Sequence, residues 1–151
     1  MDPIAISLRR VTGGAVSHDI TDMTEEEVVQ ILHEYFESLF PKVCSNCNRT
    51  FATLGKYIQI TERLGQPMSY DAELKTWNTT KPIGSVAMVN CPCGNTLALD
   101  TLRMQPPLRL ELLNWLRIET QQRGMSASEL LDHLRDEVRK RVLRSRIPEN
   151  T

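Results

Sequence analysis

The chain has 151 residues, of which 40% are hydrophobic; this is the length and composition of one soluble globular domain. Its 18 basic and 19 acidic side chains give a formal net charge of −1, which argues against bulk electrostatic attraction to nucleic acid or acidic lipid. No apolar run approaches the roughly 18 residues that span a bilayer, and the N-terminus lacks the charge pattern of a secretory signal. We therefore expect a cytoplasmic protein without a membrane span.

The N-terminal segment predicts a strand followed by a helix. Apolar residues alternate with polar or small ones between Ile4 and Leu8, which is the pattern of a half-buried strand. Thr24 and Glu27 have the spacing of a capping box, and apolar residues follow at helical intervals until Pro41. We expect an amphipathic helix here, with its acidic first turn stabilised by the helix dipole.

The middle of the chain, residues 43–100, is rich in Gly, Pro, Asn and Thr and contains every cysteine. Residues 51–64 fit a short helix or a strand, and both alternatives stay open. Residues 65–82 have little periodicity and predict an extended loop. Residues 85–90 and 96–100 each alternate in polarity around a tight turn, so they predict a hairpin.

The last third of the chain predicts two helices. Pro106 stands where proline is tolerated at a helix start, and an apolar face that includes Trp115 continues until Gly124. Ser126 and Glu129 form a second capping box, after which apolar residues recur at four-residue steps. We expect Trp115 to belong to the hydrophobic core.

The four cysteines form two closely spaced pairs. They are Cys44 and Cys47 in the motif CSNC, and Cys91 and Cys93 in the motif CPCG. A single metal ion explains this arrangement, because tetrahedral zinc takes four thiolates and each short turn delivers two of them. Asn48 and Gly94 follow the pairs and suit the left-handed backbone that directs amide groups back toward the sulfurs.

On these two motifs, residues 43–100 resemble a zinc ribbon of the rubredoxin-like kind, in which two cysteine knuckles, one or both on hairpins, hold zinc. The resemblance implies four ligands: Cys44, Cys47, Cys91 and Cys93. The chain departs from the usual CPxCG knuckle, since CPCG has one residue between its thiols, and its two knuckles lie further apart than in most ribbons. The pairing of CxC with CxxC is also similar, in ligand spacing alone, to the zinc centre of a redox-regulated heat-shock chaperone family.

Other uses of the cysteines fit less well or stay open. Covalent haem needs His after CxxC, whereas Asn48 follows Cys47. A thioredoxin-like site needs a βαβ context, and disulfides need an oxidising compartment. An iron–sulfur cluster and unliganded cysteines stay open as alternatives. We predict one zinc ion as the cofactor.

The sequence predicts no enzyme. Four thiolates close the coordination shell of zinc, whereas a catalytic zinc keeps one position open. The three histidines, His18, His33 and His133, have no recognised spacing to a cysteine or carboxylate, so we interpret them as surface or boundary residues. No nucleophile elbow, phosphate-binding glycine loop or HExxH motif is found.

Two groups of residues are candidates for contact with a partner. Tyr70 and Trp77 are aromatic residues in the polar segment predicted as a loop, where they either cover the metal site or contact a partner. The last helix is basic, with Arg139, Lys140 and Arg144 among its side chains. A helical projection places Arg135 and Arg139 on the outer side, beside acidic neighbours, so a solvated face is favoured over phosphate contact.

We therefore predict an α+β fold with a central zinc ribbon and β-hairpin, one N-terminal helix and a C-terminal two-helix unit. The expected single domain comprises residues 1–42 (strand and helix), 43–100 (zinc ribbon with long loop), 101–146 (helical pair) and 147–151 (tail). The favoured function is a non-enzymatic adaptor or regulatory module that binds another protein. The alternatives are a zinc-ribbon transcription factor that binds nucleic acid and a thiol redox switch at the metal centre. The sequence does not identify the partner, the process or the oligomeric state.

Overall fold

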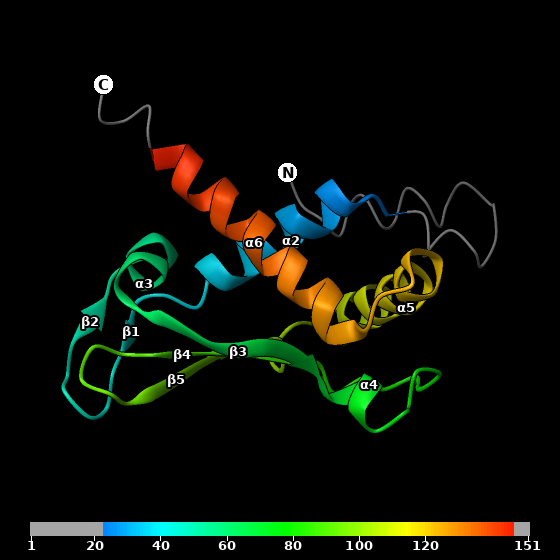
Figure 1. The fold of residues 1–151 in the computed structure, drawn as a ribbon, viewed down its shortest axis with the longest axis horizontal. Coiled ribbons are helices and arrows are strands. Elements are labelled where there is room, and N and C mark those ends of the chain that lie inside the picture. Colours follow the sequence, from blue (N-terminus) through cyan, green and yellow to red (C-terminus); the bar gives the residue numbers. More distant parts are fainter. Residues whose placement is uncertain (1–22, 147–151) are drawn as a thin grey trace.

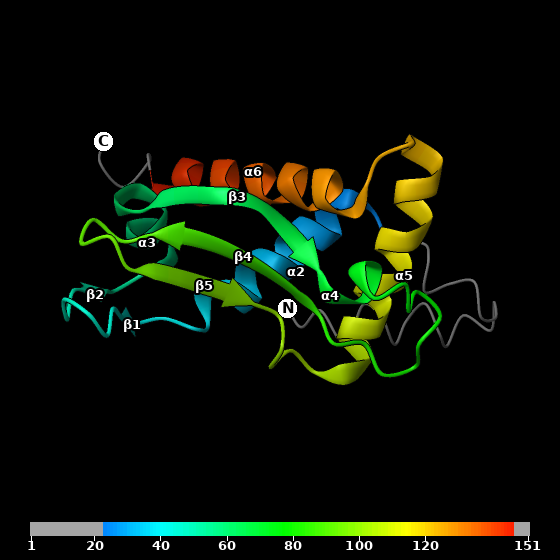
Figure 2. The ribbon, with the colours of Figure 1, turned by 60° about the horizontal axis from the view of Figure 1, so that its bottom comes forward.

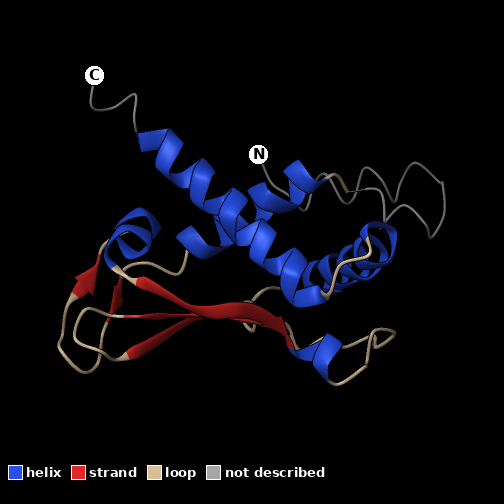
Figure 3. Ribbon diagram, in the orientation of Figure 1, coloured by secondary structure: helices blue, strands red, loops and turns tan. Residues whose placement is uncertain are grey.

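The computed structural model describes residues 23–146. Its architecture is α+β, as the sequence predicts: helices cover one face of an antiparallel sheet (Figures 1 and 3). The strand predicted between Ile4 and Leu8 and the tail at residues 147–151 lie outside the described residues, and so does His18.

The described elements comprise five helices and five strands. In chain order they are α2 (Glu25–Glu37), β1 (Lys42–Val43), β2 (Thr50–Phe51), α3 (Leu54–Ile60), β3 (Glu62–Ser69), α4 (Tyr70–Glu73), β4 (Ser85–Asn90), β5 (Thr96–Asp100), α5 (Pro106–Arg123) and α6 (Ala127–Arg146). The predicted N-terminal helix, hairpin and C-terminal helix pair are confirmed.

Both predicted capping boxes are present. The Thr24 side chain accepts a hydrogen bond from the Glu27 backbone N–H, and the Glu27 carboxylate accepts one from the Thr24 N–H. Ser126 and Glu129 repeat this exchange at the start of α6. Each box satisfies backbone donors that the first turn of a helix leaves without intrahelical partners, which fixes where the helix begins.

The middle segment contains more regular structure than the sequence predicts. Residues 54–60 form a helix whose first turn is capped by the Thr53 side chain. The extended loop predicted for residues 65–82 is wrong in its first part, because this stretch completes β3 and then forms α4. Gly65 and Pro67 make the strand hard to recognise from the sequence, because both residue types are depleted from strand interiors. Pro67 is tolerated here because β3 is an edge strand of the sheet.

The main sheet has the strand order β3-β4-β5, and both pairings are antiparallel. Its register is continuous between β4 and β5 but shifts between Leu64 and Met68 on β3. Figure 2 shows this sheet as a layer in front of α2 and α6, with the short pair β1-β2 at one end. The two hairpin turns that contain cysteines therefore lie at the same end of the molecule.

The core lies between the sheet and the helices. Val28, Leu130 and Trp115 are among its fully buried side chains, so the predicted core position of Trp115 is confirmed. The Trp115 Nε1–H also donates to the backbone oxygen of Met23 at 2.8 Å. Helix α6, at the C-terminal end of the described chain, packs against α2, α3, α5 and β3. It therefore holds this end of the chain against the N-terminal helix α2.

Candidate metal centre

The first cysteine pair lies in the turn between β1 and β2. The Cys44 N–H donates to the oxygen of Arg49 at 2.9 Å, and the Asn48 N–H donates to the oxygen of Cys44 at 2.8 Å. Asn48 has φ 63°, which is the left-handed conformation that Asn tolerates better than most residues. The chain reverses within a few residues and brings Cys44 and Cys47 to the same side of the turn.

The second pair lies in the turn between β4 and β5 and has the same construction. The Cys91 N–H donates to the oxygen of Asn95 at 2.8 Å, and the Gly94 N–H donates to the oxygen of Cys91 at 2.7 Å. Gly94 has φ 96°, a conformation that strongly favours glycine. The left-handed positions predicted at Asn48 and Gly94 are confirmed.

The two turns bring the four sulfur atoms into one cluster. The Cys44 Sγ lies 3.7 Å from the Cys93 Sγ, and the Cys47 Sγ lies 3.7 Å from the Cys91 Sγ. All four sulfurs lie within 4.8 Å of one another, although no disulfide joins them. Each knuckle contributes one buried and one exposed cysteine. The cluster thus lies at the surface, with its inner half in the core, and could hold a metal ion.

Two asparagine side chains each reach from one knuckle to a cysteine sulfur of the other. The Asn46 Nδ2 of the first knuckle donates to the Cys93 Sγ at 3.3 Å, and the Asn95 Nδ2 of the second donates to the Cys44 Sγ at 3.5 Å. Sequence reasoning missed both residues. Their positions in the sequence were the available signal. Asn46 lies between the two cysteines of its motif and Asn95 lies two residues after Cys93, where a side-chain amide can reach a sulfur.

The hydrogen-bond donors around the sulfurs favour the thiolate form, whereas the closeness of the four sulfurs opposes ionisation of all four cysteines. The Cys47 backbone N–H, helped by the Asn95 side chain and the Asn46 N–H, lowers the pKa of Cys44 to about 6. The Asn46 side chain and the Asn95 N–H lower the pKa of Cys93. The Cys93 N–H acts to lower the pKa of Cys91, but burial and the neighbouring thiols raise it to about 11. A bound cation would relieve this crowding of charge.

In the part of the chain that the structure describes, the four cysteines are the one group of three or more potential ligands close enough to share an ion. The two described histidines lie elsewhere and have other partners. His33 Nδ1 receives a hydrogen bond from Arg141 at 3.2 Å, and His133 lies 2.9 Å from the carboxylate of Glu25. The donor set is therefore entirely thiol.

The structure places Tyr70 and Trp77 away from the metal centre. Tyr70 begins α4, at the end of the sheet opposite β1 and β2 (Figure 1). Trp77 follows α4 and is half-buried against the hydrophobic core. The interpretation that these aromatic residues cover the metal site is therefore wrong. Contact of these residues with a partner stays a prediction.

The basic residues of α6 differ in their surroundings. Arg139 donates to the backbone oxygen of Ile58 at 3.4 Å, and Lys140 pairs with Glu137 at 3.1 Å, whereas Arg144 is exposed. Arg135, expected on the outer side, is instead 18% exposed and points toward β3. The helical projection failed there because β3 covers a second face of α6.

Within residues 23–146, no helix combines the length and the apolar character that crossing a membrane requires. Comparisons of the chain with family models, with curated proteins and with solved structures found no match.

Proposed function

We propose that the four cysteines hold one structural zinc ion, and that the protein is a non-enzymatic, zinc-stabilised adaptor or regulatory module that acts through contacts with another protein. The observation that carries the metal assignment is the spacing of the sulfur atoms. A tetrahedral ion with Zn–S bonds of about 2.3 Å separates its ligands by about 3.8 Å. Two of the sulfur pairs are separated by 3.7 Å, which matches this value, and all four sulfurs lie within 4.8 Å of one another.

The same spacing favours one ion over a multi-iron cluster. In a four-iron cluster each cysteine binds a different iron atom on the outside of a cube, which spreads the sulfurs more widely than the ligands of a single ion. Two knuckles on two hairpins are also the arrangement of the rubredoxin-like ribbons that the motifs resemble. A reducing cytoplasm would keep the thiols available for the metal.

A structural role follows from the donor set. Four thiolates fill the tetrahedral shell of zinc and leave no position for water or substrate. The ion instead joins two hairpins that are far apart in sequence, so its binding free energy contributes to folding. The module would then act through its surface rather than through the metal.

The protein purified without chelators is expected to contain about one zinc per chain, measured by elemental analysis. It should be colourless, because zinc has a filled d shell. Iron with visible absorbance, or metal-free protein that is fully folded, would overturn the metal assignment.

Asn95→Ala is expected to weaken zinc binding by about 10-fold to 100-fold, because groups that hydrogen-bond to metal ligands typically contribute this much to affinity. The variant loses the amide that donates to the Cys44 Sγ but keeps all four thiols. Competition with a chromogenic chelator measures the affinity. Asn78→Ala, at an exposed position outside both knuckles, is the matched control and should leave the affinity unchanged.

A surface for a protein partner is available at the α4 end of the sheet. Three large apolar side chains are exposed there: Leu74, Ile83 and Leu102. Leu74 lies between Tyr70 and Trp77, in the segment that the sequence marked as a candidate for partner contact. Exposed aliphatic residues in one region are typical of protein interaction surfaces.

The adaptor and nucleic-acid hypotheses predict opposite effects of replacing Arg139, Lys140 and Arg144 with Ala. We expect the free energy of unfolding to fall by about 1 kcal/mol or less for each exposed pair that is lost, and capture of a protein partner from native extract to be unchanged. Two of these side chains are already engaged within the protein, so duplex DNA binding should be weak at physiological salt. Submicromolar, steeply salt-dependent DNA binding that the triple variant loses would favour the nucleic-acid function instead.

A further inference from the structure

The sheet and the helices enclose a cavity of about 170 Å³. Apolar side chains from the helices and from the inner face of the sheet dominate its lining; they include Val28, Leu54, Ala87, Leu99, Leu113 and Leu134. Protein interiors hold few voids larger than one water molecule, and an apolar cavity of about 150 Å³ stays dry and takes up benzene. A cavity of this size and character is therefore suited to an apolar guest. None of the four cysteines lines it, so it is separate from the metal centre.

Buried polar groups in the lining lack partners. Tyr57 is 3% exposed, and its hydroxyl has no hydrogen-bond partner among the described residues. The same is true of the Nε and Nη1 atoms of Arg135, whose side chain also lines the cavity. A buried donor without a partner costs about 1–3 kcal/mol, and more when it is charged. A guest that presents acceptor oxygens would satisfy these groups.

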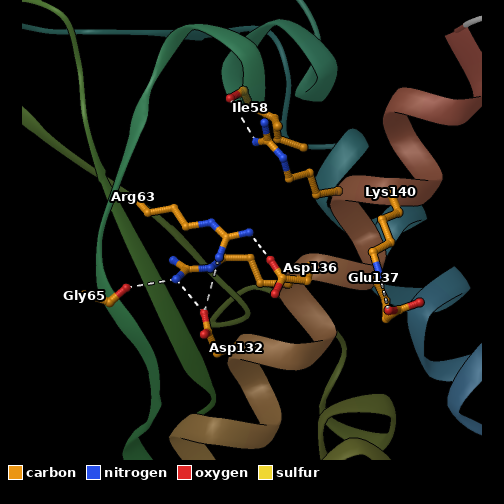
Figure 4. Close-up of polar contacts among 9 residues, drawn as sticks. Ile58, Arg63, Gly65, Asp132, Asp136, Glu137 and Lys140 are labelled. Atoms are coloured by element: carbon orange, nitrogen blue, oxygen red, sulfur yellow. Dashed lines mark hydrogen bonds and ion pairs between the residues drawn. The ribbon is translucent and has the colours of Figure 1, made fainter.

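Positive charge gathers where the cavity meets solvent. Arg63, Arg135 and Arg139 all line the cavity, and Arg63 is 39% exposed, so this side reaches the surface. Arg63 and Arg135 face the carboxylates of Asp132 and Asp136, with which they form what we term the β3–α6 polar cluster (Figure 4). Arg139 lies beside this cluster and donates instead to the backbone oxygen of Ile58 at 3.4 Å. The two guanidinium groups and two carboxylates of the cluster balance, and the Arg139 guanidinium in the same lining adds one positive charge.

The contacts within this cluster leave capacity for an anion. Arg135 uses its Nη2 for both Asp132, at 2.7 Å, and the backbone oxygen of Gly65, at 2.9 Å. Figure 4 shows the Gly65 carbonyl of β3 directed toward α6, opposite Asp132. The remaining donors of Arg135 are the unpartnered ones. A carboxylate suits them, because it carries one negative charge and only accepts hydrogen bonds.

We propose that this cavity binds a monoanionic amphiphile of the fatty-acid class. The alkyl chain occupies the apolar space between sheet and helices, and the carboxylate accepts hydrogen bonds from Arg135 within the β3–α6 polar cluster. A neutral guest would leave the Arg135 donors and the excess charge unmatched. A polyanionic guest would meet Asp132 and Asp136.

Titration of the 151-residue, zinc-loaded protein with hexanoate, whose pentyl tail is about as large as benzene, tests the proposal by calorimetry. We expect one hexanoate per chain, with hexanol binding at least tenfold more weakly because it lacks the charge. Arg135→Met should weaken hexanoate binding about tenfold or more. Arg144→Met removes the same charge from an exposed position outside the cavity and should have no effect.

A matched pair of substitutions on the sheet tests where the alkyl chain of the ligand binds. Ala87 lines the cavity and pairs with buried Leu99, whereas Ala98 is exposed and pairs with Met88 on the outer face. Ala87→Phe fills the cavity and should abolish hexanoate binding, while Ala98→Phe should preserve it. Thermal melts establish that both variants are folded.

Several results would overturn the proposal. One is a folded wild-type protein that binds no hexanoate, and another is equal affinity for hexanoate and hexanol. Unchanged binding by folded Ala87→Phe would place the guest outside the cavity. Arg109 also lines the cavity and has an unpartnered Nε; loss of binding on Arg109→Met but not on Arg135→Met would overturn the assignment of the carboxylate. Should Ala87→Phe fail to fold, the comparison of hexanoate with hexanol and the Arg135→Met variant still test the proposal.

Discussion

Cys91→Ser is expected to unfold the sheet and its two cysteine turns rather than to remove one activity. Cys91 is 2% exposed and belongs to the core cluster as well as to the group of four thiols. Structural zinc contributes on the order of 10 kcal/mol in small domains, which is comparable to the whole stability of a typical domain. Circular dichroism and urea unfolding in the presence of zinc measure the loss.

The control for this change is Ser45→Ala, which alters an exposed residue between the cysteines of the first knuckle and keeps every thiol. It should unfold at nearly the same urea concentration as the wild type. Chelation of the wild-type protein should reproduce the effect of Cys91→Ser. A Cys91→Ser protein that stayed soluble and melted at the wild-type midpoint would show that the metal is not structural.

Trp115→Ala is expected to lower the free energy of unfolding by about 3–5 kcal/mol. The Trp115 side chain is 2% exposed, so its removal leaves a large space that the surrounding helices fill only in part. The substitution also leaves the backbone oxygen of Met23 without its indole donor, which adds the cost of a lost buried hydrogen bond. Urea unfolding followed by circular dichroism gives the difference directly.

The second tryptophan is the matched comparison. Trp77 is half-buried at the edge of the core, so Trp77→Ala should cost less than half as much as Trp115→Ala. Equal losses from the two substitutions would contradict the packing described here. A larger loss at Trp77 would indicate that the segment after α4 carries more of the stability than its exposure implies.

The features that sequence reasoning placed correctly depend on local chemistry. Capping boxes at Thr24 and Ser126 mark helix starts because the bonds involved span only three residues. The grouping of the cysteines was predictable because soft ligands in two short turns suit one ion. The same locality explains the left-handed backbone at Asn48 and Gly94.

The features that it missed depend on residues far apart in the chain. Strand β3 has few buried positions and contains Gly65 and Pro67, so it becomes recognisable only through its pairing with β4. Arg135 looks solvent-facing on a helical projection, yet β3 lies against that side of α6. The cavity depends on the distance between layers, which no sequence pattern encodes.

The packing of α6 has a consequence for how the protein is made. All four cysteines precede α6 in the chain, so they leave the ribosome before α6 and the two cysteine turns can come together first. Leu130 and Leu134 of α6, which share one hydrophobic core with the buried residues of α2, emerge later. A nascent or truncated chain that ends at Gly124 would therefore keep the four cysteines that could hold a metal ion while exposing Val28, which makes such fragments targets for chaperones and proteases.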